Sequence, residues 1–286
     1  MKPAPFGYAA PETVDQVLGV LDEHGDEAKI LAGGQSLLPL MALRLAVPEV
    51  LVDVGRVAGL GASEEDSGGC RYAAGVVHSA VEDGRTPDLT GGLMPAVAAG
   101  IGYRAIRNRG TLGGSLAHAD PSAEWPVVMA ALGATFTARS LSGGTREIPA
   151  RSFAEGFFMN ALGDTEFLTS VYVPRPPPGT RWGYHKTCRK PGEFSDSLAV
   201  ALVSFEGGRV SRADIWLGAA ADVPTSVTAV TDALRGRALA EVAKDEVLDG
   251  VAASLVPARS ADERYAVRRH GITVWRALGQ IQGGTT

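Results

Sequence analysis

Two glycine-rich loops contain the residues of this chain that are best suited to hold a charged ligand. They read Leu31-Ala32-Gly33-Gly34-Gln35-Ser36-Leu37 and Asn108-Arg109-Gly110-Thr111-Leu112-Gly113-Gly114-Ser115. Glycine has no Cβ, so paired glycines can take a positive φ and let the backbone approach a ligand closely. Successive N–H groups can then converge on a phosphate, and a serine or threonine hydroxyl adds a further donor. Two such loops in one chain indicate an extended polyphosphate ligand that is held from two sides.

Glycine pairs also form ordinary tight turns, and some of the 36 glycines must do so. We expect turns at four pairs, namely Gly68-Gly69, Gly91-Gly92, Gly143-Gly144 and Gly207-Gly208. The two loops above differ from these, because each glycine pair precedes a hydroxyl or amide side chain and then an apolar residue. No GxGxxG opens a βαβ unit and no GxxxxGK[ST] occurs, which excludes Rossmann and P-loop nucleotide sites.

The composition is that of a globular protein with two or three compact lobes in 286 residues. The net charge of −5 argues against a nucleic-acid surface. The apolar runs are too short for a membrane span and the start lacks a signal-peptide pattern, so we expect a cytoplasmic protein. Two cysteines, Cys70 and Cys188, cannot supply four ligands to an iron–sulfur cluster or a structural zinc. The five histidines show no zinc-binding spacing, and we predict no metal site.

The elements that must position the loops follow from apolar spacing. Residues 11–24 are predicted to be a helix that is capped by Thr13 and ended by Gly25. Strands are predicted at 29–32, 50–54, 71–78 (turning at Gly75), 135–139 and 167–173, and further helices at 39–44, 93–99 and 124–132. We expect residues 1–57 to form one subdomain and residues 58–174 a second.

A proline-rich segment, Pro174 to Gly179, is the best domain boundary because it is stiff and cannot lie inside a sheet. Beyond it, strands are predicted at 182–186, 197–205 and 209–217, and helices at 228–234, 244–256 and 261–278. Residues 180–286 are therefore expected to form an α+β C-terminal domain.

Two segments of the sequence resemble a known protein family. The segments Ala32 to Pro39 and Arg107 to Pro121 resemble the FAD-binding medium subunit of molybdenum hydroxylases, the carbon monoxide dehydrogenase and xanthine dehydrogenase relatives. The likeness runs nearly end to end. It implies an α+β fold, with a vanillyl-alcohol-oxidase-type two-subdomain FAD-binding domain followed by a smaller α+β C-terminal domain.

The resemblance also implies residue roles. The first loop, residues Leu31, Ala32, Gly33, Gly34, Gln35, Ser36 and Leu37, is expected to hold the FAD pyrophosphate, and Thr111, Gly114 and Ser115 to lie along the same cofactor. Glu124 stands where the family usually has an aspartate on the adenosine side. The backbone near Leu168 and the side chain of Lys186 match further flavin-site positions. His118 and Asp120 are expected to have structural or FAD-contact roles, since no acid–base catalyst is needed. Phe194 is expected either beside the flavin or in ordinary loop packing.

The function implied is that of an FAD-carrying electron-transfer subunit. Electrons would come from [2Fe–2S] clusters on a small partner subunit, and a large molybdopterin subunit would hydroxylate the substrate, in a dimer of heterotrimers. FAD would be bound non-covalently and would deliver electrons to an external acceptor. Two alternatives stay open: a self-sufficient flavin oxidoreductase of the same fold, and a flavin-less scaffold.

Overall fold

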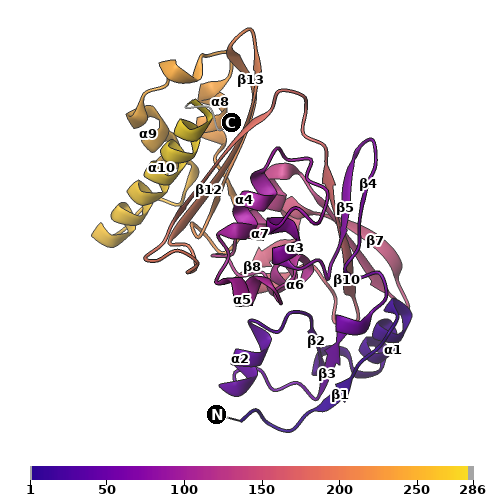
Figure 1. The fold of residues 1–286 in the computed structure, drawn as a ribbon. Coiled ribbons are helices and arrows are strands. Elements are labelled where there is room, and N and C mark those ends of the chain that lie inside the picture. Colours follow the sequence, from indigo (N-terminus) through magenta and orange to yellow (C-terminus); the bar gives the residue numbers. More distant parts are fainter. Residues whose placement is uncertain (1, 283–286) are drawn as a thin grey trace.

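The computed structural model describes residues 2–282; residue 1 and residues 283–286, which the predicted first and last domains include, lie outside them. Helices and strands are mixed, and the strands form four sheets. The chain passes from an N-terminal unit at one end of the molecule, through a central unit, to a C-terminal unit at the other end (Figure 1). This arrangement confirms the α+β class that the sequence predicts.

The N-terminal unit contains a small parallel sheet and two helices. Its strands are β1 (Gly7–Ala9), β2 (Ala28–Leu31) and β3 (Val50–Asp53), in the order β1-β3-β2, and its helices are α1 (Val14–His24) and α2 (Leu37–Ala42). Two short 3₁₀ turns follow α1 and β3. Thr13 caps α1 as predicted, since its hydroxyl accepts from the Gln16 N–H. Helix α2 begins two residues before the predicted start at Pro39.

The central unit is built on an antiparallel sheet of order β4-β5-β10-β6-β7. Its strands are β4 (Ser63–Glu65), β5 (Gly69–Ala73), β6 (Thr135–Ser140), β7 (Gly144–Pro149) and β10 (Phe167–Pro174), with a separate hairpin of β8 (Ala154–Gly156) and β9 (Met159–Asn160). Its helices are α3 (His78–Glu82), α4 (Leu93–Ala99), α5 (Arg104–Arg107), α6 (Leu112–His118) and α7 (Glu124–Leu132). Every residue of α7 is buried, because this helix contacts both this sheet and the C-terminal sheet.

The segment 71–78, predicted as a strand that turns at Gly75, does turn there but does not continue as a strand beyond the turn. Strand β5 ends at Ala73, where the chain turns and the Gly75 N–H donates to the Leu60 carbonyl at 2.8 Å. A Cβ on Gly75 would lie 2.8 Å from that oxygen, so this close turn requires glycine. Helix α3 then begins at His78. The turn therefore moves His78 out of the sheet and onto a helix start.

The C-terminal unit is an antiparallel sheet covered by helices. Its strands are β11 (Arg181–Thr187), β12 (Ser197–Glu206), β13 (Arg209–Gly218) and β14 (Thr225–Ser226), and its helices are α8 (Thr228–Leu234), α9 (Lys244–Ser254) and α10 (Ala261–Gln282). Helix α10 packs on β11 and β12. The four glycine pairs expected in turns lie at β4–β5, before α4, at β6–β7 and at β12–β13. Within residues 2–282, no helix is both long and apolar enough to cross a membrane.

Candidate functional site

A cleft of about 440 Å³ lies between the N-terminal and central units, and both glycine loops line it. Figure 1 shows α2 of the first unit facing α5 and α6 of the second. Of the sixteen residues predicted for the site, thirteen line the cleft: Ala32, Gly33, Gly34, Gln35, Ser36, Leu37, Thr111, Gly114, Ser115, His118, Asp120, Glu124 and Phe194. The other three, Leu31, Leu168 and Lys186, are not part of its lining.

The first loop presents unused backbone donors. It connects β2 to α2, and Gly34 has the positive φ of +73° that the sequence predicts for such a loop. The N–H groups of four successive residues, 33–36, donate to no other group within residues 2–282. The Gln35 side-chain amide turns back to the Gly33 carbonyl at 3.1 Å. A run of free N–H groups in a loop can form an anion site, which is the chemistry expected of this segment.

The second loop is built differently from the prediction. Gly113 and Gly114 do not take positive φ, because they lie in the first turns of helix α6. The N–H of Gly113 donates to the Ala74 carbonyl at 2.8 Å, and that of Gly114 to the Thr111 hydroxyl oxygen at 3.0 Å. Other N–H groups of this loop are also bonded within the protein, at residues 110, 112 and 115. The second loop therefore offers the cleft the hydroxyls of Thr111 and Ser115 in place of an N–H concavity.

The glycines of the two loops allow close packing of backbone on backbone. A Cβ on Gly33 would lie 2.2 Å from the Arg109 carbonyl oxygen and 2.7 Å from Gly110 Cα. A Cβ on Gly113 would lie 2.4 Å from the Ala74 Cβ. These separations are far below van der Waals contact, so alanine at either position would force the backbones apart. The two loops, distant in sequence, form a single wall of the cleft.

A buried ion pair lies at the cleft wall. Glu124, the first residue of α7, accepts from the Lys186 ammonium on β11 at 2.5 Å, and the ammonium also donates to the Gly100 carbonyl at 3.2 Å. Their side chains are only 6% and 9% exposed. Burial raises the pKa of Glu124, whereas the charge of Lys186 opposes that rise. Glu124 lines the cleft and Lys186 lies behind it, so these two residues, which were predicted separately, form one contact.

The remaining predicted residues differ in their contacts and in how exposed their side chains are. The His118 ring, at the end of α6, lies 4.8 Å from the Phe158 ring, and burial lowers the pKa of His118. Asp120 lies just beyond, where its carboxylate accepts from the Ser122 N–H at 2.8 Å. Phe194 lines the cleft while 64% exposed. Leu168 is buried in β10 beside an irregularity in its pairing with β6.

Sequence reasoning missed several residues that line the cleft. The most notable is His78, which comes from the start of α3 and is 5% exposed. Ile101 and Gly192 also belong to the lining, and a backbone bridge joins them. That bridge brings the segment containing Phe194 to the cleft. A histidine at the start of an unpredicted helix gave no signal in the sequence, because the pattern there suggested a strand.

Comparisons with known proteins agree with this geometry. The family described as the FAD-binding domain in molybdopterin dehydrogenase matches residues 4–176, and the CO dehydrogenase flavoprotein C-terminal domain matches residues 182–275. The nicotine 6-hydroxylase medium subunit of Paenarthrobacter nicotinovorans is 36% identical over 257 residues, 89% of each chain. The 6-hydroxypseudooxynicotine dehydrogenase complex subunit alpha of the same organism is 38% identical over 216 residues, 75% of this chain and 73% of the relative.

Solved structures show the same family likeness. A chain of carbon monoxide dehydrogenase from Hydrogenophaga pseudoflava superposes with a TM-score of 0.90 at 32% identity, and 99% of each chain is covered. The two family matches together span both the cleft and the C-terminal sheet. The chain therefore belongs to the FAD-binding medium subunits of the molybdenum hydroxylase family, and it is a subunit of an oxidoreductase.

Proposed function

We propose that the cleft lined by the two glycine loops binds one FAD non-covalently and that the chain passes electrons through this cofactor. The observation that carries the proposal is the row of four unbonded N–H groups at residues 33–36 on the cleft wall. Thr111 and Ser115, on the second loop of the same wall, add hydroxyl donors. Donors from both loops fit a pyrophosphate, whose oxygens only accept hydrogen bonds.

Acceptors in the same cleft fit the rest of a dinucleotide. The carboxylates of Asp120 and Glu124 line the cleft, and Asp120 forms no ion pair within residues 2–282. Carboxylate oxygens can accept from ribose hydroxyls, which a monophosphate flavin does not have in that position. The exposed ring of Phe194 lies at the cleft and can cover the flavin. This donor and acceptor set favours FAD over FMN.

The proposed role in the complex rests on the chemistry of FAD and on the small number of cysteines in this chain. Bound FAD can accept electrons singly and release them in pairs to an acceptor. Two cysteines in the chain are too few for a [2Fe–2S] cluster, so we assign the clusters to a small partner subunit. We assign the molybdopterin cofactor and the substrate pocket to a large subunit, in a dimer of heterotrimers that works in the cytoplasm.

An exposed apolar turn beside the cleft supports a partner contact. Phe157 and Phe158, between β8 and β9, and Met159, the first residue of β9, are 62%, 44% and 60% exposed. The rings of the two phenylalanines lie 4.5 Å apart, and Phe158 packs on His118, which lines the cleft. Phe158 holds a positive φ of +55°, a strained conformation for this residue type. Clustered exposed aromatic side chains are typical of protein interfaces.

The test compares the chain alone with the chain co-expressed with the products of neighbouring genes. Both preparations are assayed for dye reduction with heterocycles, aldehydes and carbon monoxide. We expect turnover only from the preparation that contains cysteine-rich and large partner subunits. Turnover by the lone chain at the rate of the complex would instead establish a self-sufficient oxidoreductase. A folded chain without any flavin absorbance, alone or in a complex, would establish a scaffold.

A further inference from the structure

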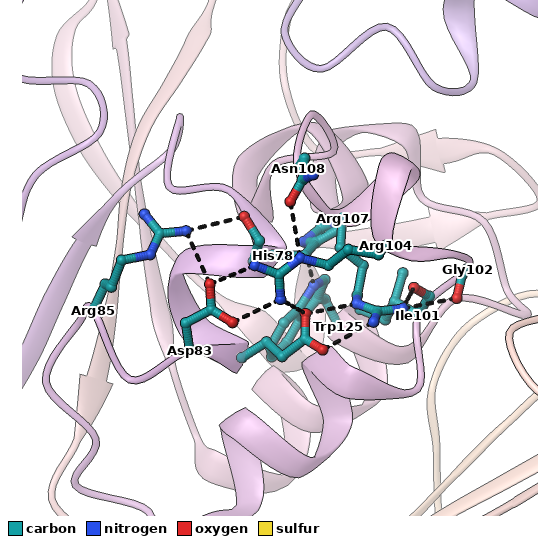
Figure 2. A network of polar contacts seen from close by, with 11 residues as sticks. His78, Asp83, Arg85, Ile101, Gly102, Arg104, Arg107, Asn108 and Trp125 are labelled. Atoms are coloured by element: carbon teal, nitrogen blue, oxygen red, sulfur yellow. Dashed lines mark hydrogen bonds and ion pairs between the residues drawn. The ribbon is translucent and has the colours of Figure 1, made fainter.

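The side chain of His78 is a buried polar group that faces the cleft and has no assigned role. It is 5% exposed and lines the cleft from the start of α3. Its Nδ1 accepts a hydrogen bond from the indole N–H of Trp125 at 3.1 Å (Figure 2). Within residues 2–282, its other nitrogen, Nε2, has no protein hydrogen-bond partner, and the buried side-chain atoms that lack a partner are instead Tyr184 Oη and Arg269 Nε. Nε2 of His78 is therefore not fully buried, and a ligand in the cleft that His78 lines can reach it.

The contact with Trp125 fixes which nitrogen of His78 carries the proton. An indole N–H can only donate, so Nδ1 must be the unprotonated nitrogen. Burial, aided by the charge of Arg107, lowers the pKa of His78 to about 4, so the ring is neutral at pH 7. A neutral imidazole has one N–H, which is therefore on Nε2. The partnerless atom is a hydrogen-bond donor.

The donor lies next to the wall that both loops form. A Cβ placed on Gly110 would be 2.8 Å from His78 Nε2, and a Cβ placed on Gly33 would be 2.7 Å from Gly110 Cα. A single glycine thus separates the Nε2–H from the first loop with its free N–H groups. Since most N–H groups of the second loop are bonded within the protein, His78 supplies a donor where that loop supplies few.

Two sets of contacts hold the ring in this position. The Nδ1 side is held by Trp125 in the fully buried helix α7. The end of α3 is held by ion pairs with α5, where Arg107 binds Glu82 at 2.7 Å. Arg104 of α5 binds Asp83 at 2.6 Å (Figure 2). Arg107 also donates to the Ile101 and Gly102 carbonyls. With its donors engaged in these contacts, Arg107 positions α3 and is not itself available to an anion in the cleft.

We propose that His78 is a cofactor-binding residue whose Nε2–H donates to a pyrophosphate oxygen of the dinucleotide, with Trp125 as the residue that positions it. This inference rests on the proposed function, because it takes FAD as the occupant of the cleft. A neutral donor holds the pyrophosphate without adding a charge that would have to be buried when the cleft is empty.

The variants His78→Asn and His78→Gln distinguish the acceptor role of Nδ1 from the donor role of Nε2. Asparagine can place its carbonyl oxygen where Nδ1 accepts from Trp125 but is too short to reach the Nε2 position. Glutamine can place its amide N–H near the Nε2 position and restore the donor. FAD is titrated into the cofactor-stripped full-length chain by flavin fluorescence, with thermal unfolding as a control for folding.

We expect His78→Asn to weaken FAD binding about ten- to a hundredfold, because a hydrogen bond to a charged group is worth about 1.5–3 kcal/mol. His78→Gln should recover most of that loss. Phosphorus NMR of bound FAD should show a displaced pyrophosphate resonance in His78→Asn but not in His78→Gln. A folded His78→Asn chain with wild-type FAD affinity and unchanged phosphorus resonances would overturn this proposal and leave the proposed function intact.

A measurement on the unaltered chain keeps the proposal testable if the variants do not fold. In protein labelled with ¹⁵N-histidine, we expect His78 to show a protonated Nε2 and an unprotonated Nδ1 at pH 7. Saturation with FAD should shift the Nε2–H resonance more than that of Nδ1. An Nε2–H resonance that FAD leaves unmoved would overturn the role of His78. A chain that binds no FAD at all would overturn the proposed function itself.

Discussion

Gly33→Ala tests the close contact between the two loops. The added Cβ would meet the Arg109 carbonyl oxygen at 2.2 Å, whereas ordinary contact begins near 3.4 Å. The loops must therefore separate by about 1.2 Å, since the obstructing atoms are backbone and cannot rotate away. Overpacking of this kind costs about 1–3 kcal/mol of unfolding free energy.

The same displacement acts on cofactor binding. A shift of about 1.2 Å takes an N–H···O contact from about 2.9 Å to about 4 Å, which is beyond hydrogen-bond range. The loss of one bond to a charged acceptor costs about 1.5–3 kcal/mol, or roughly ten- to a hundredfold in affinity. We therefore expect Gly33→Ala to lower both the unfolding midpoint of the apo chain and its affinity for FAD. Urea unfolding and fluorescence titration measure the two effects separately.

Two other glycines serve as matched controls. Gly19 lies inside α1 with no heavy atom within 4 Å of an added Cβ, so Gly19→Ala should keep full FAD affinity and stability or gain slightly. Gly114→Ala should be milder than Gly33→Ala, because its Cβ meets a side-chain oxygen, Thr111 Oγ1, at 2.7 Å. Wild-type stability and affinity in Gly33→Ala would refute the contact. Lowered stability with unchanged affinity would confirm the contact and refute the loop's role in binding FAD.

Two further predictions concern buried titratable groups. Lys186→Met should destabilise the chain by about 3 kcal/mol in urea unfolding, because it leaves Glu124 buried without its partner. Adding Glu124→Gln to this variant should recover much of the lost stability. Equal losses in the single and the double variant would contradict this prediction. Burial lowers the pKa of His78 and His270 to about 4, from 6.5 in the unfolded chain. The unfolded state then binds more protons between these values, so apo-chain stability should be full above pH 6.5 and fall toward pH 4 by about 3 kcal/mol per histidine. Replacing His270 with Asn should flatten that fall in urea unfolding; an unchanged slope would contradict the assignment.

The sequence predicted the local elements better than the contacts between them. Helix α1 follows from the spacing of Val17, Leu18 and Leu21 and from the Thr13 cap, all of which are local. The turn predicted at Gly75 is present, but the strand predicted beyond it, up to His78, was wrong, and the carbonyl that Gly75 contacts at Leu60 lies outside the segment. Apolar spacing alone cannot show such a partner.

The site was predicted as a set of residues but not as an arrangement. The family resemblance identified thirteen residues that line the cleft, yet it treated Glu124 and Lys186 as separate contacts, although the structure pairs them. The second loop was expected to resemble the first, but Gly113 and Gly114 lie in a helix. Both errors have one cause, since the pairing of β11 with α7 and the backing of α6 by Ala74 are long-range contacts.

The cofactor content of the purified chain tests the central claim most directly. The chain is isolated with its partner subunits, the flavin is released by heat, and the released flavin is weighed by mass spectrometry and quantified against protein. A cleft with donors at residues 33–36 and acceptors at Asp120 and Glu124 predicts FAD at one molecule per chain. FMN at that ratio, or a folded chain without flavin, would contradict it.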